Sequence, residues 1–131
     1  MTAAKPIQRN PVAWFEIHVA DMQRAKVFYE SVFKRSLFPL ETADDNFTMH
    51  VFEGDVQSAG ATGALVLHRD RQPTTEGVMV YFSCEDCAVE AQRAIDHGGR
   101  IFKPKHSIAT NGFIAIIGDT EGNAIGLHSM K

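Results

Sequence analysis

Several features that would point to a specialised partner or compartment are missing from this chain of 131 residues. Its formal net charge is −3 and it has no cluster of basic residues, so neither nucleic acid nor an anionic membrane is an expected partner. No stretch approaches the ~20 apolar residues that a membrane-spanning helix needs. Residues 1–10 are polar and lack the apolar run of a signal peptide. We therefore expect a soluble, cytoplasmic protein.

Cysteine is also scarce, and the two that occur, Cys84 and Cys87, are separated by two residues. Such a pair can form a redox dithiol or half of a zinc site. A redox pair begins at the start of a helix, whereas Cys84 is predicted to end a strand, and no second cysteine pair is present to complete a zinc site. We interpret both as small buried residues that flank a helix cap.

Sequence motifs of the common nucleotide-binding and hydrolase sites are absent as well. The chain has no glycine-rich phosphate loop with a lysine, no Gly-x-Ser-x-Gly turn and no dinucleotide-binding fingerprint. The function must therefore be sought in another kind of site.

What the chain does contain is a duplication. The segment Gly63–His68 resembles Asn123–His128, 60 residues further on, and each ends in Leu-His. Upstream, Ile17–Asp21 and Phe82–Asp86 are both apolar runs that stop at an aspartate. Two copies are too few for a solenoid. The pattern favours one α+β unit duplicated and folded against itself, which leaves a cleft where a ligand can bind.

Hydrophobic periodicity predicts the order βαβββ in each half. Asp21 and Asp86 suit the N-cap position of the two helices, whose apolar residues recur every three or four positions. We treat residues 1–131 as one domain with module one at about 11–68, a connector at 69–77 and module two at 78–129. The predicted strands cover residues 12–19, 37–40, 47–52, 64–68, 78–84, 101–103, 113–117 and 124–128.

Two groups of residues carry a family resemblance. The first is Trp14–Ile17 with Val19–Ala25 and Phe28-Tyr29, and the second is Gly112-Phe113 with Asp119–Ile125. Together they resemble the vicinal oxygen chelate superfamily, which includes glyoxalase I, bleomycin-resistance proteins and extradiol ring-cleaving dioxygenases. The resemblance spans about residues 11–129. It implies two βαβββ modules related by a pseudo-twofold axis, forming a curved mixed sheet around a cleft.

The resemblance also implies where metal ligands would stand, namely at Trp14, Val66, Met79 and Gly126. None of these side chains suits a divalent metal, and a shift of one residue in any strand does not restore histidine or glutamate. We therefore expect no cofactor. The alternative is a non-standard site for Zn, Ni, Fe or Mn, built from Glu16 and His18 with His68 or His128.

Strand alternation predicts which other side chains share the cleft, because residues two apart point to the same face. Glu16 interrupts an apolar strand, which is costly unless the carboxylate is paired, hydrated or facing a cavity. The predicted catalytic residues are Glu16, Tyr81 and His128. The predicted ligand pocket consists of Trp14, His18, Val66, His68, Met79 and Gly126.

Each of these polar residues also has a purely structural interpretation. Glu16 can bond backbone amides or a histidine, and a histidine at a strand end is often a hydrogen-bonded surface residue. In the functional interpretation, Glu16 is a base or hydrogen-bond acceptor and His128 orients it or the ligand.

Two functions remain open at this stage. One is binding of a small organic molecule in a metal-free cleft, and the other is a metal-dependent lyase, isomerase or dioxygenase of the glyoxalase type. Because superfamily members often build their clefts from two chains, the resemblance further implies a homodimer.

Overall fold

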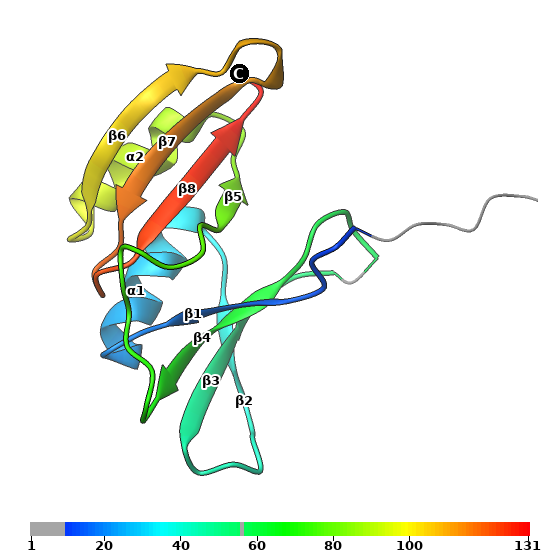
Figure 1. Ribbon diagram of the computed structural model, residues 1–131, viewed down its shortest axis with the longest axis vertical. Coiled ribbons are helices and arrows are strands. Elements are labelled where there is room, and N and C mark those ends of the chain that lie inside the picture. Colours follow the sequence, from blue (N-terminus) through cyan, green and yellow to red (C-terminus); the bar gives the residue numbers. More distant parts are fainter. Residues whose placement is uncertain (1–9, 56) are drawn as a thin grey trace, which may run out of the picture.

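The computed structural model describes residues 10–55 and 57–131 (Figure 1), so the polar segment of residues 1–9 lies outside the described residues. Eight strands, two α-helices and one short 3-10 helix follow one another along the chain. Their bounds are β1 Phe15–His18, α1 Met22–Phe33, β2 Leu37–Leu40, β3 Phe47–Phe52, β4 Gly63–His68, β5 Tyr81–Ser83, α2 Cys87–Asp96, β6 Arg100–Ser107, η1 Ala109–Asn111, β7 Phe113–Gly118 and β8 Ala124–Ser129.

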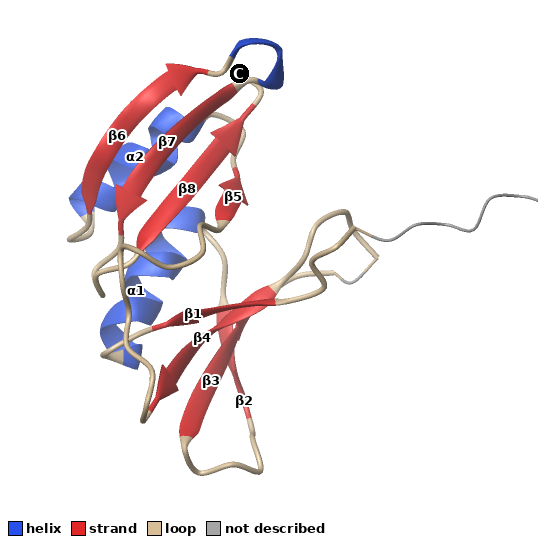
Figure 2. Ribbon diagram, in the orientation of Figure 1, coloured by secondary structure: helices blue, strands red, loops and turns tan. Residues whose placement is uncertain are grey.

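The strands form two separate four-stranded sheets, one from each half of the chain (Figure 2). Sheet A has the order β1-β4-β3-β2 and sheet B the order β5-β8-β7-β6. In each, the first strand pairs in parallel with the last, and the other neighbours are antiparallel. The predicted α+β fold of two βαβββ modules is confirmed.

Both helices begin as the sequence predicts. Asp21 and Asp86 adopt extended backbone conformations, and their carboxylates accept from Arg24 N–H at 3.0 Å and Ala88 N–H at 3.0 Å. Each aspartate thus satisfies an amide that the first helical turn leaves free. The helix-facing side of both sheets then packs into one shared core.

That core spans both modules. It joins Phe28 and Tyr29 of α1 to Leu65 of sheet A and to Ile117 and Leu127 of sheet B. Because strand side chains alternate, the neighbouring residues point to the opposite side of each sheet. Neither helix covers that side, which we call the helix-free face of sheet A or of sheet B.

The turn before β8 fastens module two to the start of α1. Glu121, whose side chain is fully buried, accepts from the N–H groups of Ala20 and Asp21 at 2.9 and 2.8 Å and pairs with Arg24 at 2.6 Å. Tyr29 donates its hydroxyl to Asp119 at 2.7 Å. The sequence analysis identified this turn only as a family motif and missed its role between the modules.

Three predicted strands differ in extent by more than one residue. The predicted strands at 12–19 and 78–84 shorten to Phe15–His18 and Tyr81–Ser83, so Trp14 and Met79 precede the strands instead of lying within them. Both are edge strands, which pair on one side only. The strand predicted at 101–103 extends to Arg100–Ser107, because bulges let an edge strand continue past Pro104. His106, expected in a loop, therefore lies in β6.

Candidate functional site

Glu16 lies on the helix-free face of sheet A. Ile17 is buried in the shared core, whereas Glu16 points to the opposite side of the sheet, as strand alternation requires. Trp14, 40% exposed, donates from its indole Nε1 to Glu16 Oε2 at 3.1 Å. The carboxylate is exposed rather than desolvated, and it has one indole partner among the described residues.

Two imidazoles stand beside Glu16 on the same face. His18 and His68 meet edge to face with ring centroids 6.4 Å apart, and Phe47 stacks on His68 at 5.8 Å. Burial lowers the pKa of His18 below its ordinary value, and Arg71 lowers it further while Glu16 opposes the shift. The lowered pKa favours the neutral form of His18. Asp70 N–H donates to His68 Nδ1 at 2.9 Å, which leaves Nε2 as the donor of the neutral ring.

An apolar patch completes this face. Met49, Ala64 and Val66 form a small buried cluster, and Val66 is 1% exposed. The side chain of Val66 is therefore covered by its neighbours and is not available to contact a ligand. Phe38 and Leu40 of β2 belong to the same face by pairing, and both are more than half exposed.

The remaining predicted residues lie on or beside sheet B. The Tyr81 ring covers Gly126 so closely that a β-carbon at Gly126 would collide with it. His128 Nε2 donates to the backbone carbonyl of Asn111 at 2.7 Å, which leaves Nδ1 as an acceptor. Met79 is partly exposed in the segment before β5.

The predicted residues thus fall into two groups on two sheets. Trp14, Glu16, His18, Val66 and His68 belong to sheet A, whereas Met79, Tyr81, Gly126 and His128 belong to sheet B. The two sheets share no paired strand, so the chain does not assemble Glu16, Tyr81 and His128 around one point by strand pairing. Their roles stay predictions.

The donor set of a single chain does not fit the superfamily's divalent metal. Within residues 10–55 and 57–131, no three side chains of histidine, cysteine, aspartate or glutamate gather closely enough to hold an ion. Glu16 and His18 share a face, but strand residues two apart are wide for joint ligation at about 2 Å.

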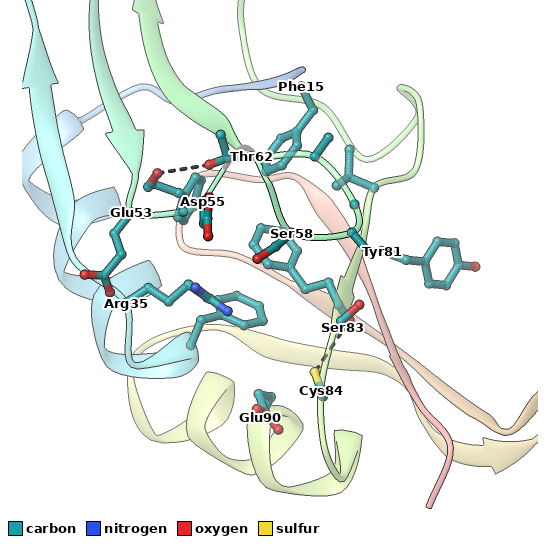
Figure 3. A pocket seen from close by; sticks show the side chains of 18 of the residues that line it. Phe15, Arg35, Glu53, Asp55, Ser58, Thr62, Tyr81, Ser83, Cys84 and Glu90 are labelled. Carbon is teal, nitrogen blue, oxygen red and sulfur yellow. Dashed lines mark hydrogen bonds between the residues drawn. The ribbon is translucent and has the colours of Figure 1, made fainter. Parts of the chain in front are cut away.

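Sequence reasoning missed a second feature, a cavity of about 690 Å³ between the modules (Figure 3). It is lined by Phe33 at the end of α1, by Arg35 just after it, by the loop between β3 and β4, by β5 and by Glu90 of α2. Of the predicted site residues only Tyr81 lines it. A signal was present, because Glu90 lies three residues after Cys87 and four before Ala94, on the buried stripe of α2.

Helices long and apolar enough to cross a membrane are lacking in the described part of the chain.

Comparisons with known proteins support the fold. Glyoxalase I from Zea mays matches with a TM-score of 0.70 and 18% identity over 96% of this chain and 48% of the maize chain. The chain thus spans about half of that enzyme. TnmS3, an antibiotic binding protein from Streptomyces sp. CB03234, matches with a TM-score of 0.68 and 21% identity over 95% of this chain and 98% of TnmS3.

A glyoxalase/bleomycin resistance protein from Albidiferax ferrireducens also matches, with a TM-score of 0.67 and 16% identity over 92% of this chain and 98% of that one. No protein-family model and no curated protein matches. These identities establish the fold alone. The chain has the vicinal oxygen chelate fold seen in glyoxalase I and in the glyoxalase/bleomycin resistance/dioxygenase superfamily.

Proposed function

We propose that this protein binds a small organic molecule between two copies of the chain. The helix-free face of sheet A in one copy faces the helix-free face of sheet B in the other, and the ligand lies between them. The homodimer brings the two groups of predicted site residues together around one cleft. The protein has no membrane or nucleic-acid partner in this proposal and works in the cytoplasm.

One observation supports this proposal most. Glu16, His18 and His68 lie beside the exposed Trp14 on a face that neither helix covers. Trp14 and the apolar side chains of β2 supply contact area, while the three polar groups supply directional contacts. Glu16 accepts hydrogen bonds, neutral His18 accepts or donates one, and His68 Nε2–H donates. Sites for small organic ligands commonly combine apolar walls with a few placed polar groups.

Sheet B offers a complementary surface. Tyr81 and Phe102 are each about half exposed, and His128 presents an acceptor nitrogen. Exposed aromatic residues on both faces favour burial against each other or against an apolar ligand. Two similar folds support a ligand cleft, since one belongs to an enzyme, glyoxalase I, and another to an antibiotic binding protein.

Trp14 makes the proposal testable, because it is the only tryptophan of the chain. A neutral aromatic with a hydroxyl group, 2-naphthol, is titrated while Trp14 fluorescence is recorded. We expect saturable quenching, weakened about tenfold in Glu16→Gln because a hydrogen bond to a charged acceptor is lost.

The matched control is Glu76→Gln, an exposed glutamate of the connector, which should bind the probe like the unmodified protein. Absence of saturable quenching, or equal affinities for Glu16→Gln and Glu76→Gln, would overturn the proposal.

The proposed site works without a bound metal. Protein purified without chelator and then offered Zn, Ni, Fe or Mn should retain less than one equivalent per chain. Stoichiometric retention that is lost in Glu16→Gln or His128→Ala would instead support the metal-dependent alternative.

A further inference from the structure

The cavity between the modules shares Tyr81 with the proposed cleft but is otherwise distinct from it, because its phenylalanine walls come from the helix-facing side of the molecule. Phe15, Phe33, Phe52 and Phe82 line it and also pack against the shared core. Its volume of about 690 Å³ lies within the range of small-molecule sites. None of the residues proposed to contact the ligand on sheet A lines it.

The aromatic rings form a connected floor. Phe33 and Phe82 stack with centroids 4.2 Å apart, and Phe15 and Phe52 each meet Phe82 at 5.7 Å. Phe15, Phe33 and Phe82 are only partly buried, so their rings remain available to an occupant of the cavity. Aromatic faces attract apolar groups and also cations.

The charges around this floor are mainly negative. Four carboxylates, those of Glu53, Asp55, Glu85 and Glu90, line the cavity, against one guanidinium, that of Arg35. Figure 3 shows Arg35 reaching between the loop that carries Asp55 and the helix that carries Glu90. Glu85 pairs with Lys131 at 3.4 Å and Glu90 with Arg93 at 4.0 Å, whereas Glu53 and Asp55 have no ion pair within 4.0 Å in the described part of the chain.

Glu90 is the most buried of the four carboxylates. Its side chain is 15% exposed, and its only ion pair is a contact of 4.0 Å between Oε2 and Arg93. Its Oε1 is buried without a hydrogen-bond partner in the described residues. The neighbouring thiol of Cys84 is uncharged, because burial raises its pKa to about 12 and the negative charge of Glu90 contributes to the rise. A largely buried carboxylate with one long ion pair and one unpartnered oxygen is costly unless something else supplies further counter-charge.

We propose that this cavity is a second binding site, selective for an aromatic or aliphatic amine whose ammonium group pairs with Glu90 while its apolar part packs on the phenylalanine floor. The ammonium group gives Glu90 Oε1 the hydrogen-bond donor that it lacks among the described residues. An organic acid of the same size meets three more carboxylates than guanidinium groups and is rejected.

The experiment compares two ligands of similar size and opposite charge, 2-phenylethylammonium and 3-phenylpropanoate, by isothermal titration of the intact protein. We expect saturable binding of the amine, with the acid at least about tenfold weaker. Glu90→Gln should weaken amine binding about tenfold, because it removes the charge and keeps the shape.

Two further variants separate this site from the proposed cleft. Glu16→Gln should bind the amine normally, whereas Ser58→Phe, at an exposed loop position that lines the cavity, should block it. Thermal unfolding verifies that each variant is folded, and Ser58→Phe decides alone if Glu90→Gln is not. No saturable binding of the amine, equal binding of the acid, or full affinity in the folded cavity variants would overturn the proposal.

Discussion

The two ends of helix α1 both contact module two, but in opposite ways. At its N-terminus the buried side chain of Glu121 has a partner on each side, with two backbone amides and Arg24 bonded to its carboxylate. At its C-terminus, Phe33 and Arg35 border a cavity in which a buried oxygen of Glu90 has no partner. The contact at the N-terminal end is structural, and we call this contact of Glu121 with Ala20, Asp21 and Arg24 the joint. The C-terminal end leaves a buried carboxylate oxygen without a hydrogen-bond partner, as binding sites do when no ligand is bound.

The difference predicts that two glutamates of the same fold respond differently to substitution. Glu121→Ala should lower the free energy of unfolding by about 3 kcal/mol, because it leaves the N–H groups of Ala20 and Asp21 and the guanidinium of Arg24 without their acceptor. Urea unfolding measures this. The control Glu85→Ala, which removes an exposed pair with Lys131, should cost under about 0.5 kcal/mol. Equal losses in both variants would contradict the comparison.

The same joint should weaken in acid. Burial alone would raise the pKa of Glu121, but bonds from Arg24, from the Asp21 and Ala20 amides and from Thr120 hold it below its ordinary value of 4.5. A lowered pKa in the folded state means that the stabilisation is complete above about pH 4.5 and is lost as the pH falls through the folded-state value.

The difference in unfolding free energy between the unmodified protein and Glu121→Ala should therefore shrink as the pH is lowered below about 4.5. Urea unfolding at a series of pH values tests this. A difference that stays constant, or grows, down to the acid limit of folding would show that the charge of Glu121 does not stabilise the joint.

At the C-terminal end of α1, substituting the glutamate should change the free energy of unfolding by a smaller amount and in the opposite direction. Glu90→Gln should leave the free energy of unfolding unchanged or raise it by up to about 1 kcal/mol, because an under-compensated charge is removed. Thermal and urea unfolding of this variant give the value. A loss above about 1 kcal/mol would mean that Glu90 is a structural residue like Glu121.

Much of the fold was predictable because it depends on local patterns. The helix caps Asp21 and Asp86, the two βαβββ units and the face of β1 that carries Glu16 all follow from capping chemistry and strand alternation. The edge strands were predicted less well, since their length depends on the partner strand rather than on their own residues. His106, for example, joined β6 only through bulges paired with β7.

The sites were harder to predict for the same reason. Alternation places Glu16 on a face, but it does not say that Tyr81 and His128 belong to a second sheet. The cavity was not predicted because Phe33 and Phe82 have the spacing of core residues, and because the loop of residues 53–62 has no hydrophobic periodicity. Contacts between distant segments decide both cases.

Within the proposed dimer, one matched pair of variants isolates the helix-free face of sheet A. Phe38, 54% exposed, lies on that face, whereas Val27, 52% exposed, lies on α1. A glutamate at Phe38 would place a charge in the dimer interface, whereas a glutamate at Val27 would remain in solvent. Phe38→Glu should therefore dissociate the dimer and Val27→Glu should not.

Light scattering at micromolar concentration tests the proposed cleft most directly, because the proposal brings the two groups of site residues together across two chains. The account predicts a mass twice the 14.5 kDa of the chain for the unmodified protein and for Val27→Glu, and a mass near 14.5 kDa for Phe38→Glu. A mass near 14.5 kDa for the unmodified protein would contradict it.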